Sequence, residues 1–184
     1  MDGLRFNVAG LLKENAGATR DYDVDAAPEE LAGELSELDD ARIVAPLRGH
    51  IRMLRTPRSV FVRGLLQTTL LVECSRCLVD TEVPVRFDLD DEFFPEIDVH
   101  TGHALPRPDD DGLGFLIDAG HELDLGESVR QHLLLELPMQ AICSETCAGL
   151  CPRCGVDLNT GACACTEEAI DERLAPLRAL FEHQ

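Results

Sequence analysis

The stretch Glu82-Val83-Pro84-Val85-Arg86-Phe87-Asp88-Leu89-Asp90 carries the clearest strand pattern in the chain. Its odd positions are apolar, and its even positions are charged or proline. Because successive side chains of a strand point to opposite faces, this alternation predicts a strand with one buried and one solvated face.

Two segments upstream extend this strand into a sheet. In residues 47–53 the apolar positions alternate with Arg48, His50 and Arg52, which predicts a half-buried strand with a basic outer face. The run 60–72 is rich in β-formers and predicts either two strands or one long bent strand.

The N-terminal region adds shorter elements. Residues 4–8 and 19–25 are expected to form two strands that pair through the turn at 15–17, and residues 28–38 to form a short helix. With the strands above, these elements predict an α+β fold: an antiparallel β meander or a small curled barrel.

A helix is predicted over residues 125–137. Asp124 and Glu127 form a capping-box pattern at its start, and Pro138 ends it. Apolar residues at every fourth position form a stripe that we expect to cover the sheet: Leu125, Val129, Leu133 and Leu137.

Between the last strand and this helix, residues 95–114 carry three prolines and the run Asp109-Asp110-Asp111. Such a stretch has little to bury and predicts an acidic loop. His100 and His103 have a metal-like spacing there, but a solvated loop is the preferred interpretation.

These elements divide the chain into two predicted parts. Residues 1–140 form a β-rich domain that includes the loop 95–114 and the helix 125–137. Residues 141–184 form a cysteine-rich, zinc-binding tail that ends in a short helix from Thr166.

The composition limits what the protein can bind. Its 184 residues carry 35 acidic and 16 basic side chains, a net charge of −19. A field of that sign repels phosphate, so a general polyanion binder is disfavoured. No apolar run approaches the roughly 18 residues of a membrane span, and the first residues lack a signal-peptide pattern. We therefore expect a cytoplasmic protein with no membrane partner.

Eight cysteines in a cytoplasmic chain favour metal ligation, because disulfides persist mainly in oxidising compartments. The turn Cys151-Pro152-Arg153-Cys154-Gly155 is typical of a zinc knuckle, in which two thiolates two residues apart grip one ion. The remaining ligands come from nearby cysteines, namely Cys143, Cys147, Cys163 and Cys165. Six thiolates exceed one tetrahedral site, so which four ligate stays open, as do a second ion, a spare pair, a disulfide and an iron–sulfur cluster.

Cys74-Ser75-Arg76-Cys77 is a separate Cys-x-x-Cys pair at the end of the β-rich run. It can supply two more zinc ligands, act as a redox dithiol or pack as structural thiols at a corner of the sheet. A thioredoxin-like dithiol opens a helix after a parallel strand, whereas this pair lies in a β meander. Redox catalysis is therefore disfavoured, and of the other two interpretations a structural pair is preferred.

Sequence patterns of common catalytic sites are missing. The chain has no phosphate-binding loop, no dinucleotide fingerprint and no Gly-x-Ser-x-Gly elbow, and no His-Glu pattern accompanies the cysteines. A zinc ion held by four cysteines has no open position for a substrate water. The predicted zinc is structural, and neither an enzyme nor a small-molecule substrate is expected.

Together, the helix and the cysteine pattern resemble the YceD-like family, the large ribosomal RNA subunit accumulation proteins. The resemblance rests on Leu123-Asp124-Leu125, Leu137-Pro138, residues 143–165 and Cys74-Ser75-Arg76-Cys77-Leu78. It implies a non-enzymatic factor in ribosome biogenesis that supports accumulation of 23S-type rRNA. It also implies large-subunit precursors as the partner, through either a basic ribosomal protein or the rRNA backbone. The alternative function is a thiol-based redox or metal-responsive protein that uses Cys74 and Cys77.

One basic island interrupts the acidic chain, because residues 41–72 hold six arginines and no acid. These arginines can pair with acidic residues across the sheet, such as Glu82, Asp88 or Asp90. Alternatively, four of them can contact rRNA phosphates: Arg48, Arg52, Arg55 and Arg58. The sequence leaves both interpretations open.

Overall fold

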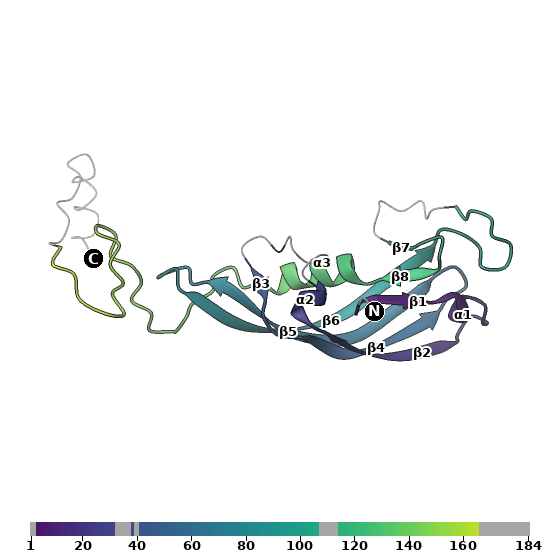
Figure 1. Cartoon of the computed structure of the whole chain (residues 1–184), viewed down its shortest axis with the longest axis horizontal. Coiled ribbons are helices and arrows are strands. Elements are labelled where there is room, and N and C mark those ends of the chain that lie inside the picture. Colours follow the sequence, from purple (N-terminus) through teal and green to yellow (C-terminus); the bar gives the residue numbers. More distant parts are fainter. Residues whose placement is uncertain (1–2, 32–37, 39–40, 107–113, 166–184) are drawn as a thin grey trace, which may run out of the picture.

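A mixed β-sheet organises the protein, which is described here by a computed structural model covering residues 3–31, 38, 41–106 and 114–165 (Figure 1). The sheet has eight strands in the order β1-β8-β7-β6-β5-β4-β2, and β3 pairs with β5. In chain order the elements are β1 (Arg5–Asn7), α1 (Ala9–Leu12), β2 (Thr19–Ala26), α2 (Pro28–Leu31), β3 (Arg42–Ile43), β4 (Leu47–Arg55), β5 (Val60–Glu73), β6 (Asp80–Pro95), β7 (Phe115–Ile117), β8 (Glu122–Asp124) and α3 (Gly126–Glu136).

The β5–β6 hairpin is the longest feature of the sheet and projects beyond its other strands (Figure 1). Residues 60–73 form one strand, and their pairing with β6 is antiparallel along the whole length. The alternation predicted for residues 82–90 is confirmed, because Val85, Phe87 and Leu89 are buried while the charged residues between them are exposed.

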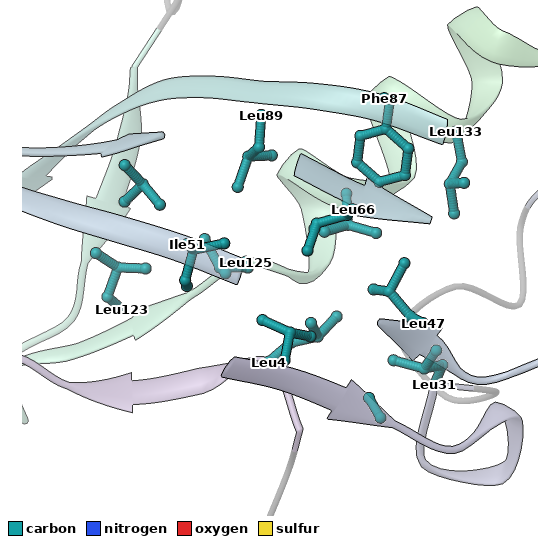
Figure 2. Close-up of a cluster of buried hydrophobic side chains, with 14 of the residues drawn as sticks. Leu4, Leu31, Leu47, Ile51, Leu66, Phe87, Leu89, Leu123, Leu125 and Leu133 are labelled. Carbon is teal, nitrogen blue, oxygen red and sulfur yellow. The ribbon is translucent and has the colours of Figure 1, made fainter. Parts of the chain in front are cut away.

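Buried side chains from the strands and from α3 form one hydrophobic core (Figure 2). Leu47 and Ile51 of β4, Leu66 of β5 and Leu125 just before α3 are each fully buried in it. The half-buried character predicted for residues 47–53 is thereby confirmed, with Arg48, His50 and Arg52 on the outer face.

The sheet curls until its two edge strands lie close to each other. The rings of Phe6 on β1 and Tyr22 on β2 are 5.0 Å apart, and a Cβ on Gly3 would lie 2.6 Å from the Cβ of Ala26. The predicted pairing of the first two strands is nevertheless wrong: β1 pairs with β8, and β2 pairs with β4. The meander is also not purely antiparallel, because β6 and β7 run parallel.

The predicted acidic loop begins with the last residue of β6, Pro95, and a bridge between Ile97 and Ala104 closes its first part. Its run of aspartates and the terminal helix expected from Thr166 lie outside the described residues. Within the described ranges, no helix has the length and apolarity needed to cross a membrane.

The helix expected at residues 125–137 is α3, which contacts β6. Val129 and Leu133 enter the core, and the ring of His132 stacks on Phe87. The predicted capping box does not form: the Asp124 carboxylate accepts from the Gly126 N–H, and Glu127 binds Arg130 and Gln131. That α3 covers the sheet as a whole stays a prediction.

The carboxylate of Asp91 on β6 anchors α3 through two of the helix's side chains. The Ser128 hydroxyl donates to Asp91 Oδ2 at 2.5 Å, and His132 Nε2 lies 3.0 Å from the same oxygen. Asp91→Ala leaves the buried Ser128 without its acceptor, so we expect the free energy of unfolding to fall by about 2 kcal/mol. Chemical denaturation followed by circular dichroism measures this effect.

The matched control is the neighbouring Asp90→Ala. Asp90 pairs with Arg63 on the outer face, where both side chains are largely solvated, so its loss should cost at most about 1 kcal/mol. Equal destabilisation by the two substitutions would show that Asp91 does not anchor the helix.

Candidate metal centres

The eight cysteines gather into two groups of four. In each group the four Sγ atoms all lie within 4.8 Å of one another. Site A consists of Cys74, Cys77, Cys143 and Cys147; site B consists of Cys151, Cys154, Cys163 and Cys165. Site A joins the tip of the β5–β6 hairpin to the segment after α3, so residues 66 or more positions apart in the chain meet there.

Each site is built on the same backbone turn. At site B the Gly155 N–H donates to the Cys151 carbonyl at 2.9 Å, and the Cys151 N–H donates to the Val156 carbonyl at 2.8 Å. At site A the Leu78 N–H donates to the Cys74 carbonyl at 2.9 Å, and the Cys74 N–H donates to the Val79 carbonyl at 2.9 Å. The residue after the second cysteine has a positive φ in both turns, 72° and 59°. The Cys74–Cys77 pair therefore has the same knuckle geometry as the Cys151–Cys154 pair.

The sulfur separations fit a tetrahedral ion. Zn–S bonds of about 2.3 Å place the sulfurs of a tetrahedron about 3.8 Å apart. The Sγ atoms of Cys74 and Cys147 are 4.0 Å apart, and those of Cys77 and Cys143 are 3.6 Å apart. At site B, Cys151 and Cys163 are 3.5 Å apart. A disulfide needs about 2.05 Å, so the eight cysteines are free thiols with the spacing of metal ligands.

Backbone amides prepare one thiol of each site for ligation. Hydrogen bonding from the backbone of Arg76 lowers the pKa of the Cys74 thiol to about 6, and that from Cys154 and Arg153 lowers the pKa of Cys151 to about 6. Crowding by the other thiols acts in the opposite direction: it raises the pKa of Cys143 to about 12, with Cys147 the largest cause. Ionisation of all four thiols of a group at neutral pH would therefore require a cation among them.

Hydrogen bonds around site A hold its two halves in place. The Ser75 N–H donates to the Ala141 carbonyl at 2.8 Å, and Arg76 Nη1 donates to the Cys147 carbonyl at 2.9 Å. Asn159, which lies in the sequence between two cysteines of site B, contacts site A: its Oδ1 accepts from the Ala148 N–H at 2.7 Å, and its Nδ2 donates to the sulfur of Cys147 at 3.5 Å. These contacts orient the thiols in the way that outer-shell hydrogen bonds orient the ligands of a metal site.

All eight cysteines singled out in the sequence belong to one of the two groups. The sequence spacing left open which four cysteines form each group. Cys143 and Cys147 join Cys74 and Cys77 instead of completing the site of Cys151 and Cys154. The geometry thus supports the second-site interpretation of Cys74 and Cys77 over the preferred structural pair. A repeated sequence pattern could have indicated that Cys74 and Cys77 form a second knuckle, because Cys-x-Arg-Cys-x-Val occurs at both 74–79 and 151–156.

The arginines of the basic island pair largely within the chain. Arg48 bonds Asp25 at 3.0 Å and Arg52 bonds Asp21 at 2.7 Å across the β2–β4 pair. Arg42 lies 3.6 Å from Asp80 of β6, and Arg63 bonds Asp90, so the expected pairing across the sheet is confirmed for these arginines, with β2 aspartates as additional partners. Hydrogen bonding by Arg52 lowers the pKa of the Asp21 carboxyl. Arg55 is partly buried and donates to the Thr56 and Ser59 carbonyls, and that burial lowers its pKa. Among the described residues, the Arg58 side chain has no ionic partner.

Fold and site together define a class of protein: a curled mixed sheet with two four-cysteine groups able to hold a metal ion, one of which takes two of its cysteines from the tip of the longest hairpin. The chain belongs to the YceD family, whose model, described as large ribosomal RNA subunit accumulation protein YceD, matches residues 62–181. The matched region contains both cysteine groups.

Named relatives agree with this assignment. The chain is 28% identical over 180 residues to the chloroplastic large ribosomal RNA subunit accumulation protein YCED homolog 1 of Zea mays, covering 85% of this chain and 61% of that one. It is 28% identical over 158 residues to the homolog of the same name in Arabidopsis thaliana, covering 74% and 49%. An uncharacterized protein of Mycobacterium tuberculosis is 30% identical over 156 residues, covering 85% and 70%. The chain thus spans about half to three-fifths of the length of the plant relatives. No solved structure matches it.

Proposed function

We propose that this protein is a non-enzymatic factor in biogenesis of the large ribosomal subunit, and that it supports accumulation of 23S-type rRNA by binding within the assembling particle. The observation that carries the proposal is that the chain belongs to a family described by accumulation of large-subunit rRNA. The match to this family covers both cysteine groups. A factor with this role acts where large subunits are assembled, and we propose that this place is the cytoplasm.

The two cysteine groups would each hold one structural Zn²⁺. The donor set supports this role, because four thiolates complete the tetrahedral shell of zinc and leave no position for a substrate or water. Zinc at site A would fix the tip of the β5–β6 hairpin to the segment after α3, and zinc at site B would fold the tail. The protein's contribution to assembly is then a shaped surface.

A basic ribosomal protein is the partner that the charges favour. The chain carries −19, and the β2 aspartates lie beside the arginines that would have to meet rRNA phosphates. Exposed ion pairs of this kind contribute little stability and can open. They therefore disfavour contact between these arginines and rRNA but do not prevent it. Contact of Arg48, Arg52, Arg55 and Arg58 with the rRNA backbone is therefore one outcome of the test below.

A thiol redox function of Cys74 and Cys77 is the second candidate, favoured by the lowered pKa of Cys74. Two observations weigh against it. Cys74 is completely buried, whereas redox-active cysteines are accessible to their partners. Its sulfur also faces three other thiols in a metal-like arrangement. Fast reaction of Cys74 with a thiol probe in the zinc-loaded protein would support the redox function instead.

Sedimentation of a tagged chain through a sucrose gradient tests the proposed function. We expect the protein to travel with large-subunit precursors, and depletion of the protein to lower 23S-type relative to 16S-type rRNA. A chain that stays at the top of the gradient while rRNA levels remain normal would refute the proposal.

A variant with Arg48→Ala, Arg52→Ala and Arg58→Ala decides between the two partners. Arg55 is left in place, because its hydrogen bonds support the β4–β5 turn. We expect association with precursors to survive in this variant. Weaker binding together with a shallower salt dependence, by about 0.9 in the logarithmic slope for each phosphate that is no longer neutralised, would assign the interaction to the rRNA backbone.

A further inference from the structure

A groove of about 340 Å³ lies next to site A, between the tip of the β5–β6 hairpin and the segment that follows α3. Its walls are mainly apolar and include Val72, Leu78, Leu137 and Met139, while Glu73 adds a carboxylate. Apart from Ala41, its lining falls within the residues that match the family model. Most of the groove therefore lies within the region that matches the family model.

Leu78 is the most informative residue of this groove. It occupies the position after the second cysteine of the knuckle, with a φ of 59°, where site B has Gly155 with a φ of 72°. A side chain in this left-handed region is strained, and glycine is the residue that adopts it freely. The hydrogen bonds of the knuckle hold the backbone in this conformation, but the Leu78 side chain is 59% exposed and gains little from burial within the chain. A large apolar side chain that is exposed at a position where the other knuckle has glycine suits a contact outside the chain.

Other apolar side chains extend this surface. Met139 is fully exposed, and Val79 at the hairpin tip and Ile142 beyond the groove are also exposed. A methionine adapts its flexible side chain to many shapes, which suits a binding surface. Clustered apolar side chains of this kind mark an interaction site, whereas scattered ones do not.

Site A shapes the groove as well as bordering it. Cys74 and Ser75 line one wall and Ala141 lines the other, and the Ser75 N–H donates to the Ala141 carbonyl at 2.8 Å. The Cys143 N–H lies 3.4 Å from the Cys74 sulfur. Because these contacts lie directly beside the four thiols, zinc bound at site A would fix the separation of the two walls.

The charges around the groove indicate its occupant. Glu73 is exposed, and among the described residues it has no cationic partner. Arg76 at the hairpin tip donates from its Nη1 to the Cys147 carbonyl at 2.9 Å. A second copy of this chain would bring two charges of −19 and two Glu73 carboxylates together. A positively charged polypeptide with an apolar side chain fits better.

We propose that this groove docks a lysine- or arginine-rich segment of a large-subunit ribosomal protein, with an apolar side chain seated against Leu78 and a cationic one beside Glu73. The proposal rests on the proposed function, since it names the surface through which the factor joins the assembling particle.

Carbodiimide cross-linking of the zinc-loaded full chain to purified large-subunit precursor particles tests the docking. The reagent joins a carboxylate to a lysine amine in direct contact, and Lys13 is the only lysine of this chain, so nearly all its cross-links report partners. Mass spectrometry of the digested product is expected to show Glu73 joined to a lysine in a basic segment of a ribosomal protein. A cross-link from Glu73 to Lys13 of a second copy would instead make the groove a self-interface and overturn the proposal.

Two substitutions separate docking from folding. Leu78→Gly relieves the strained backbone and should keep both zinc ions, yet it should lower the Glu73 cross-link yield by about tenfold or more, the value of one buried leucine. Met139→Ala should lower it in the same direction. Leu135→Ala is the control, because Leu135 is an 80% exposed leucine of α3 that does not line the groove.

The outcomes distinguish this inference from the function beneath it. If the chain still sediments with precursors but Leu78→Gly and Leu135→Ala give equal yields, the groove is not the docking site and the proposed function stands. If the unmodified chain itself does not sediment with precursors, the proposed function fails and the docking proposal fails with it.

Discussion

Cys151→Ser should release one zinc ion per chain and expose residues 148–165 to protease, while the β-sheet stays folded. The physical reason is that this segment has few large aliphatic side chains, so its own core cannot fold it. A structural zinc site supplies about 10–16 kcal/mol of apparent binding free energy at neutral pH, far more than the cost of ordering a segment this short. Limited proteolysis with mass mapping, alongside circular dichroism, measures the effect.

Cys74→Ser is the companion substitution at site A. It should also remove one zinc ion, but the new cleavage sites should lie between α3 and Cys147, where the hairpin tip no longer holds the chain. Ser75→Ala is the matched control, since only the backbone of Ser75 contributes to the site. Unchanged zinc content in Cys74→Ser would return Cys74 and Cys77 to a purely structural role.

The second large effect is expected from Gly49→Ala in β4. A Cβ at Gly49 would lie 2.0 Å from the backbone oxygen of Leu65 on β5, and one at Gly64 would lie 2.5 Å from the backbone oxygen of His50. Backbone atoms cannot move aside as a flexible side chain can, so β4 and β5 would have to separate. We expect the free energy of unfolding to fall by about 3 kcal/mol or more.

Denaturant titration of Gly49→Ala beside Gly10→Ala tests this expectation. Gly10 lies in α1, where an added Cβ meets nothing closer than 3.8 Å, and alanine there should be neutral or stabilising by up to about 1 kcal/mol. Similar stability of the two variants would mean that the curl of the sheet does not depend on the close approach of β4 and β5.

The sequence predicts those parts of the fold that depend on local patterns, but not those that depend on contacts between distant segments. Residues 82–90 could be assigned because alternation is a local property, and one strand buries one face. The partner of β1 could not, because a three-residue strand carries no register signal and its place is set by contacts with β8. The close approach of β4 and β5 at Gly49 and Gly64 is non-local in the same way, because it is visible only when β4 lies beside β5.

The candidate metal centres show the same division. Spacing identifies a knuckle at Cys151 and Cys154, because ligands two residues apart are a local feature. It cannot show that Cys143 and Cys147 turn back to the hairpin tip, since that depends on where α3 ends. After Cys77 the usual glycine is replaced by Leu78, which hid the second knuckle. The repeated arginine and valine of the two turns were the remaining clue.

The claim on which the rest depends is that the eight cysteines form two four-thiolate zinc sites. Native mass spectrometry of the full chain, purified under reducing conditions without added metal, tests it most directly. We predict a mass increase of two zinc ions and no disulfides, with four thiolates protected from alkylation at each site. A protein that is fully folded and contains no zinc, or one that holds an iron–sulfur cluster or disulfides in its place, would contradict the account.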